Sequence, residues 1–155
     1  MSKCNYWLMK SEPSAFSIDD LKKRPKQTDC WSGVRNFQAR NMMRDEMQLN
    51  DKIFFYHSSC KVPGIAGTAE VVKTSYPDHT ALDPTSQYFD PKASKDKPIW
   101  YMVDVKFVEK FPDLISLEDL RNNKDLKDMI LLRRGNRLSI TPVTQKQWDS
   151  IMAML

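Results

Sequence analysis

The sequence predicts a single α+β domain, spanning residues 1–155, that is built on a curved or closed β-sheet. Strand patterns are mixed irregularly with short helices along the chain, which is typical of this class. The clearest strand pattern lies between Trp100 and Phe111, where apolar and polar residues alternate. A chain of 155 residues with 41% hydrophobic and 28% charged residues is ordinary for one globular domain with its own core.

The first part of the chain predicts one strand and two helices. Residues 6–9 are aromatic and apolar, as in a strand. Ser17 is followed three residues later by Asp20, a capping-box pattern that begins a short helix, and Pro25 ends it. Residues 36–47 lack Gly and Pro and carry apolar residues at four-residue spacing, which predicts a second helix.

Three strands are predicted in the middle of the chain. Residues 53–59 are apolar on both faces, so neither face is wholly in water. Residues 65–72 form the next strand, whose small residues allow another backbone or a ligand to come close. The third strand, 100–111, directs four side chains to one face: Tyr101, Val103, Val105 and Phe107.

The remaining segments predict two helices and a long loop. Capping boxes at Ser116 and Thr144 each begin a helix, and the apolar stripe of the last helix is typical of core packing. Residues 72–100 contain four prolines and no clear strand or helix pattern. Because this segment is rich in aromatics, including Tyr88, we expect an ordered loop that flanks a pocket.

Composition limits the function classes. Three scattered cysteines without a CxxC pair (Cys4, Cys30, Cys60) predict free thiols rather than disulfides or a zinc site. The formal charge of +4 permits binding to a polyanion but does not require it. No apolar run approaches the roughly 18 residues of a membrane span, and we expect an intracellular protein, cytoplasmic in a bacterium and nuclear in a eukaryote.

Three segments combine aromatic rings, small hydroxyls, an amide and an arginine around glycines: residues 31–37 (WSGVRNF), 54–60 (FFYHSSC) and 63–67 (PGIAG). An aromatic ring offers a stacking face, hydroxyls read polar edges, and glycine leaves room for a ligand. The three segments predict a pocket for a flat polar molecule.

The same segments, together with others, carry a family resemblance. Residues 6–13 (YWLMKSEP), 31–36, 55–59, 63–67, 76–78, 83–84, 101–105 and 137–143 (RLSITPV) are similar to the motifs of the EVE domain family. The resemblance covers essentially the whole chain. It implies a PUA-like fold: a curved, mostly antiparallel β-barrel with short helices packed at its rim. It also implies kinship with YTH and SRA domains.

The resemblance further implies a non-catalytic module that holds a modified base, a cytosine derivative in DNA or, as the alternative, a base in RNA. Nucleic acid is then the expected partner, with no cofactor, no metal and no membrane; the oligomeric state stays open. Holding a base from a duplex requires its removal from the stack, and stacking on an aromatic ring offsets that cost.

Eleven residues are candidates for the base pocket: Trp31, Ser32, Gly33, Val34, Asn36, Tyr56, His57, Ser58, Gly64, Ile65 and Trp100. The aromatic rings would stack, the polar side chains would read the base edge, the glycines would admit the ligand, and Val34 and Ile65 would line a niche for the added group. Structural alternatives stay open: Trp100 can equally be core, Asn36 can cap the next helix, and His57 can be a hydrogen-bonded residue at a strand end.

Phosphate contacts are expected from Arg35, Arg40, Arg44 and Lys61, although Arg40 and Arg44 can equally form a solvated helix face. The main alternative function is a small hydrolase acting on a nucleotide or modified nucleobase, with His57 as the base near neutral pH. A second alternative is a protein-interaction module, which would be favoured if neighbouring side chains filled the pocket.

Overall fold

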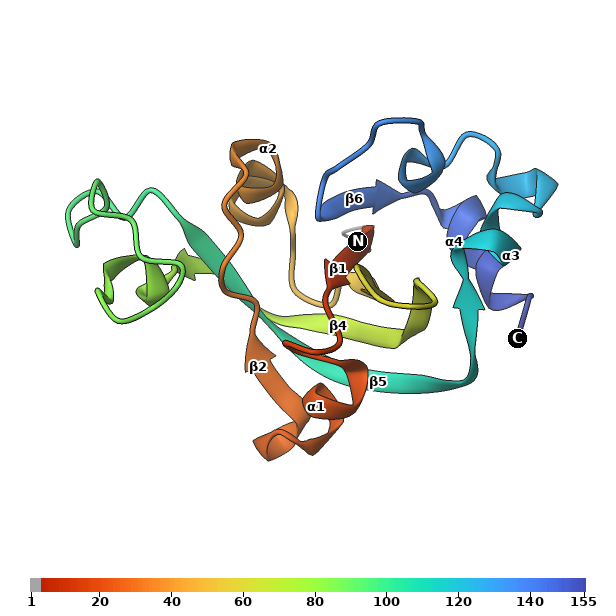
Figure 1. Ribbon diagram of the computed structural model, residues 1–155, viewed down its shortest axis with the longest axis horizontal. Coiled ribbons are helices and arrows are strands. Elements are labelled where there is room, and N and C mark those ends of the chain that lie inside the picture. Colours follow the sequence, from red (N-terminus) through yellow and green to blue (C-terminus); the bar gives the residue numbers. More distant parts are fainter. Residues whose placement is uncertain (1–3) are drawn as a thin grey trace.

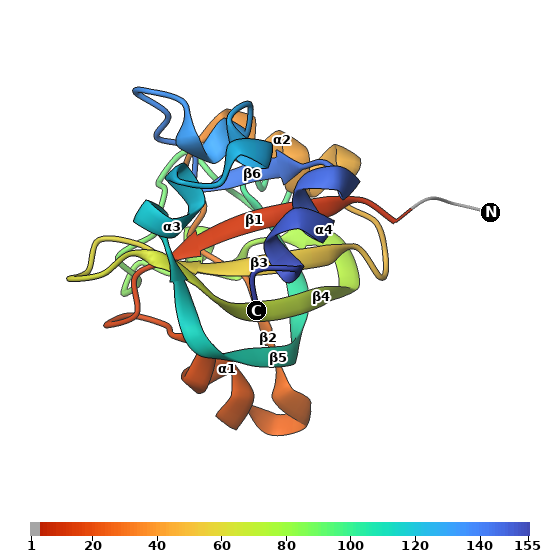
Figure 2. The ribbon, with the colours of Figure 1, turned by 90° about the vertical axis from the view of Figure 1, so that its right-hand side faces the viewer.

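A computed structural model describes residues 4–155 and contains one mixed, six-stranded sheet. The strands are β1 (Tyr6–Ser11), β2 (Thr28–Cys30), β3 (Lys52–His57), β4 (Gly64–Pro77), β5 (Tyr101–Ser116) and β6 (Ile140–Val143). Their order is β2-β5-β4-β3-β1-β6, and Figure 2 shows the run from β5 to β6 as a stack. β1 pairs with β3 in parallel, and every other pair is antiparallel.

The expected closure into a barrel is wrong, although the α+β class and the mostly antiparallel pairing are confirmed. The long strands β4 and β5 bend at several register shifts, which curl the sheet. The edge strands are short, however: β2 pairs only with β5, and β6 only with β1. Among residues 4–155 no ladder joins β2 to β6, so the sheet remains open.

Short helices cover the sheet, and local capping explains where they begin. They are α1 (Ile18–Lys23), α2 (Phe37–Asn41), α3 (Leu117–Arg121) and α4 (Gln145–Met152), with 3-10 turns at Pro25–Gln27, His79–Leu82, Lys124–Leu126 and Ile130–Leu132. The capping boxes predicted at Ser17, Ser116 and Thr144 are all formed. The helix predicted over residues 36–47 is instead α2 followed by a π-helical turn, Met42–Glu46.

The sheet separates two apolar clusters, and β3 supplies both. Ile53 and Phe55 belong to the first cluster, which also contains Trp31. Phe54 and Tyr56 alternate to the second, which is covered by α4. This alternation decides which β3 side chains can reach a pocket on one face.

The loop between β4 and β5 is ordered, as predicted. It contains the His79–Leu82 turn and lies beside α2 at the left of Figure 1. Backbone hydrogen bonds hold it, including Asp90 N–H to the Ala81 carbonyl at 2.9 Å. Among residues 4–155, no helix has the length and apolar character needed to cross a membrane.

Candidate nucleic-acid interface

A cavity of about 650 Å³ opens at one end of the sheet. We call it the Trp31 cavity. Its walls come from five parts of the chain: Lys10, Ser11, Glu12, Ala15 and Phe16; Cys30, Trp31, Ser32, Gly33, Val34 and Arg35; Ser58 and Ser59; Gln87 and Tyr88; and Arg137 and Ser139. The volume lies within the range of about 300–1,000 Å³ that is usual for small-ligand sites.

The parallel pairing of β1 and β3 explains why these segments meet. Both strands end at the same edge of the sheet, with Ser11 opposite His57. The backbone N–H of Ser58 donates to the Ser11 carbonyl at 3.0 Å, so the residues after both strands lie together. Lys10 N–H donates to the Ser139 carbonyl at 2.8 Å, which adds the segment before β6.

Trp31 forms the apolar wall of the cavity. Its backbone N–H donates to the Val103 carbonyl at 2.7 Å, which continues the β2–β5 pairing for one more residue. The indole meets Phe55 edge-to-face, with ring centroids 5.3 Å apart and planes at 75°. Only 7% of Trp31 is exposed, so packing fixes the part of the ring that faces the cavity.

Gly33 allows the long loop to form the opposite wall. It has φ +83°, and a Cβ on its backbone would lie 2.7 Å from Cζ of Tyr88. Its N–H donates to Asp78 at 2.8 Å. The glycine was expected to bring backbone groups to a ligand, but it admits the Tyr88 ring instead and its N–H is already bonded.

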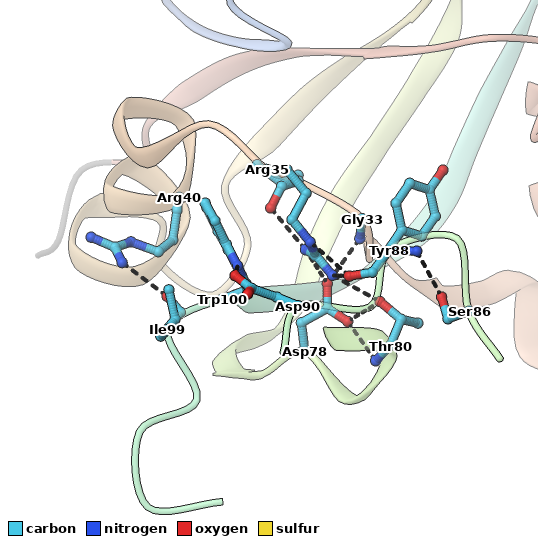
Figure 3. A network of polar contacts seen from close by, with 11 residues as sticks. Gly33, Arg35, Arg40, Asp78, Thr80, Ser86, Tyr88, Asp90, Ile99 and Trp100 are labelled. Carbon is cyan, nitrogen blue, oxygen red and sulfur yellow. Dashed lines mark hydrogen bonds and ion pairs between the residues drawn. The ribbon is translucent and has the colours of Figure 1, made fainter. Parts of the chain in front are cut away.

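Arg35 holds the loop in place (Figure 3). Its guanidinium pairs with the fully buried Asp78 at 3.0 Å and donates to the Tyr88 carbonyl at 2.8 Å. Burial works against ionisation of Asp78, but hydrogen bonds from Thr80, Gly33 and Arg35 outweigh it and hold the pKa of the carboxyl below its usual range.

The remaining charged groups make the cavity basic. Burial lowers the pKa of the Lys10 ammonium, and within residues 4–155 no acidic side chain forms an ion pair with it. Arg137 adds a second cation and Glu12 one anion. Burial and nearby carboxylates, chiefly Asp29, raise the pKa of the Cys30 thiol to about 11, so the thiol stays protonated near neutral pH.

Six predicted site residues line the Trp31 cavity together: Trp31, Ser32, Gly33, Val34, Arg35 and Ser58. Asn36 lies just outside and caps α2, its side chain accepting from Ala39 N–H at 3.0 Å. His57 also lies outside: its Nε2 accepts from the Ile18 N–H at 3.1 Å, and burial lowers the pKa of the imidazole. Both residues take the structural alternatives weighed above.

Three further candidates lie away from the cavity, because they pack on the other face of the sheet or allow two strands to pair closely. Tyr56 and Ile65 are buried in the second apolar cluster. Gly64 is needed where β4 meets β5, since a Cβ there would collide with the Ile115 carbonyl oxygen.

Trp100 does not line the cavity but contacts Arg35, which does: the guanidinium lies 5.3 Å from the indole centroid. Its indole N–H donates to Asp90 at 2.7 Å, and its ring stacks on Phe37. The candidate phosphate ligands differ in their partners. Arg40 donates to the Ile99 carbonyl at 2.9 Å, Arg44 pairs with Asp45 at 2.8 Å, and Lys61 is exposed in the β3–β4 turn.

Several lining residues were not predicted from the sequence. Lys10 and Ser11 end β1 and Glu12 follows it, and Arg137 and Ser139 precede β6. Both segments stood among the motifs of the family resemblance, which was the available signal. Only the pairing of strands far apart in sequence shows that they share one site.

Comparisons with known proteins agree with this architecture. The EVE domain family matches residues 5–154. Mouse thymocyte nuclear protein 1 is 47% identical over 97% of this chain and 73% of its own length. A human THYN1 crystal structure, in complex with 5-methylcytosine-containing DNA, has a TM-score of 0.90 and 46% identity over 97% of this chain and 96% of that one.

A more distant likeness concerns the fold alone. A YTH domain from Zygosaccharomyces rouxii superposes with a TM-score of 0.56 at 12% identity, covering 99% of this chain and 87% of that one. It shows that the two chains share a fold. The full-length match and the identity to thymocyte nuclear protein 1 place this chain in the EVE domain family.

Proposed function

We propose that this protein binds DNA that carries a modified cytosine and holds the modified base in the Trp31 cavity, without acting on it chemically. The observation that carries the proposal is a partly basic cavity with an aromatic wall, in a chain 46% identical to a protein crystallised with 5-methylcytosine-containing DNA.

The cavity has the parts that recognition of an extruded base needs. Trp31 and Tyr88 offer aromatic surface, and base stacking on such rings contributes about 1–3 kcal/mol. The hydroxyls of Ser32, Ser58 and Ser139 can donate to or accept from a base edge. Val34 is the apolar residue available for a methyl group.

Charge around the cavity suits the phosphate of the extruded nucleotide. Lys10 and Arg137 are the candidate contacts, because Arg35 is already neutralised by Asp78. A half-buried ammonium with a lowered pKa gains an anionic partner when a phosphate binds, which favours its charged form.

The positions of the reactive groups favour binding over hydrolysis. His57, the candidate general base of the hydrolase alternative, is directed at the N–H of Ile18 and lies outside the lining. Cys30 is in the lining, but its raised pKa makes it a poor nucleophile. The cavity is also not filled by neighbouring side chains, which argues against a purely protein-binding module.

The test is binding of the purified protein to matched duplexes that contain cytosine, 5-methylcytosine or 5-hydroxymethylcytosine at one position, at two salt concentrations. We expect a preference for a modified duplex that persists at the higher salt, because the preference comes from the base and not from phosphates. Equal affinity for all three duplexes would refute the proposal.

A further inference from the structure

Phe37 is an exposed aromatic residue just after the segment that lines the Trp31 cavity. It is the first residue of α2 and follows Arg35, a lining residue, by two positions. Fully 57% of Phe37 is exposed, which is unusual for a large ring beside a ligand site. An exposed ring in this position needs an explanation, because burial is the usual fate of phenylalanine.

The Phe37 ring is backed by a rigid support. Its inner face stacks on Trp100, with centroids 4.8 Å apart and planes within 18°. Trp100 is only 6% exposed, and Asp90 fixes its indole through a 2.7 Å hydrogen bond. Figure 3 shows Trp100 between Arg40 and Arg35, so the supporting ring connects Phe37 to the cavity wall.

Much of the Phe37 ring remains accessible. The Arg40 guanidinium lies over the ring, 4.7 Å from the Phe37 centroid and 5.9 Å from the Trp100 centroid. With Trp100 stacked on the ring and Arg40 close to it, 57% of Phe37 is still exposed, so ring surface is available for stacking.

The surroundings of Phe37 carry a small excess of positive charge. Arg40 is adjacent, and the Ile99 carbonyl that it contacts belongs to a loop with three exposed lysines, Lys92, Lys95 and Lys97, and one exposed acid, Asp96. This charge complements the phosphates that flank a base in DNA. Proteins that enter a base stack insert an apolar side chain such as phenylalanine and contact the DNA with basic side chains nearby.

From these contacts we infer that Phe37 stacks inside a DNA duplex next to the base held in the Trp31 cavity, occupying the place that this base leaves. The inference rests on the proposed function. It adds that the substrate is a duplex, and that the ring of Phe37 offsets the stacking that is lost when the base moves out.

The experiment compares two forms of one methylated oligonucleotide: a duplex with 2-aminopurine beside the 5-methylcytosine, and the same strand alone. With saturating wild-type protein the 2-aminopurine fluorescence should stay low, because the Phe37 ring stacks on the neighbouring base; with saturating Phe37→Ala it should rise, because the gap is left open and the probe unstacks. Phe37→Ala should also weaken duplex binding about tenfold or more, while its affinity for the single strand stays within about twofold.

Two further variants control for folding and exposure. Phe37→Tyr keeps the aromatic face and should keep the duplex affinity. Leu49 is equally exposed, at 57%, but lies before β3, at the opposite end from the cavity, so Leu49→Ala should change neither reading. Melting temperatures of all variants confirm that they fold.

Three results would overturn the inference. If Phe37→Ala weakens duplex and single strand equally, the ring does not fill a gap in a duplex. If it weakens neither, this surface serves another partner. If wild-type protein binds methylated and unmethylated DNA equally well in both forms, the proposed function itself fails. This outcome is distinct from a failure of the Phe37 inference alone, because it is seen with the wild-type protein.

Discussion

Arg35 and Asp78, 43 residues apart, form a 3.0 Å ion pair that joins the segment before α2 to the end of β4. Asp78 is fully buried, and Arg35 retains 23% of its side-chain exposure. The same carboxylate accepts from the N–H of Gly33 and from Thr80. One buried charge thus orders both walls of the Trp31 cavity.

Asp78→Asn keeps the shape of the side chain and removes its charge, leaving Arg35 half-buried without a counter-ion. We expect the free energy of unfolding to fall by about 2–4 kcal/mol, close to the cost of breaking a buried pair. Asp45→Asn breaks the exposed pair with Arg44 and should cost much less, because solvent screens an exposed ion pair. Urea denaturation measures both, and equal costs would contradict the structural role of Asp78.

Gly33→Ala should be more costly than the same change at Gly135. Both glycines have positive φ, +83° and +77°, so both alanines carry a backbone penalty of about 1–2 kcal/mol. Only at Gly33 does a Cβ meet a neighbour, the Tyr88 ring, and overpacking adds about 1–3 kcal/mol.

Displacement of Tyr88 should also change the cavity. Gly33→Ala is therefore expected to weaken binding of methylated duplex, and Gly135→Ala to leave it unchanged. If thermal unfolding shows the same loss for both variants, the loop is not held against Gly33.

Local patterns predicted the elements whose signal is local. A capping box needs only residues three apart, and the boxes at Ser17, Ser116 and Thr144 are all formed. The strand predicted from the alternation after Trp100 is present, but it continues to Ser116 as β5. β2 was not predicted, because three residues are too few for a periodic pattern.

The position of the site could be predicted only in part, because neighbouring strands decide it. β3 is apolar on both faces, so the sequence does not show which face meets the cavity, and Tyr56 lies on the other one. Closure of the sheet likewise depends on edge strands far apart in sequence. Residues 31–35, by contrast, were predicted together because they are consecutive in the sequence, and all five line the cavity.

Lys10→Met should separate binding from stability. Burial lowers the pKa of Lys10, so replacing the ammonium by an apolar group of similar length should leave the melting temperature unchanged or raise it. If Lys10 contacts a phosphate, its loss should weaken binding of methylated and unmethylated duplexes alike. The slope of the logarithm of the binding constant against the logarithm of the salt concentration should become shallower by about 1, the contribution of one phosphate contact.

The control for this change is Lys52→Met. Lys52 is exposed at the other end of β3, away from the cavity. Lys52→Met should leave the salt dependence of duplex binding unaltered in titrations from low to high salt. Identical slopes for the two variants would remove Lys10 from the phosphate contacts.

His57 predicts a pH dependence of stability. Burial lowers its folded pKa below the ordinary value of 6.5. The neutral imidazole also accepts from the Ile18 N–H at 3.1 Å, a hydrogen bond that protonation of Nε2 would remove. The unfolded chain therefore binds the proton more readily. The stabilisation is present above about pH 6.5 and is lost as the pH falls through the folded pKa.

The measurement is the melting temperature from about pH 7.5 to about pH 5. His57→Gln, whose amide oxygen can accept the same hydrogen bond, should show a shallower decline than wild type. His79→Gln removes the other histidine of the chain and should decline like wild type. If the melting temperature of His57→Gln declines as steeply as that of wild type, other titratable groups cause the decline.

Trp31→Leu tests the stacking wall, and Trp148→Leu is its matched control. Both tryptophans are 7% exposed, but Trp148 stacks on Phe54 in the second cluster, on the other face of the sheet. Each change removes a buried ring and should cost about 2–4 kcal/mol of stability. Only Trp31→Leu removes aromatic surface from the cavity, so it alone should lower the affinity for 5-methylcytosine duplex, by about tenfold, while non-specific binding persists. Fluorescence anisotropy at a temperature where both variants are folded measures these affinities. A similar loss in both variants would attribute the effect to destabilisation, and Trp31 would not be the surface on which the base stacks.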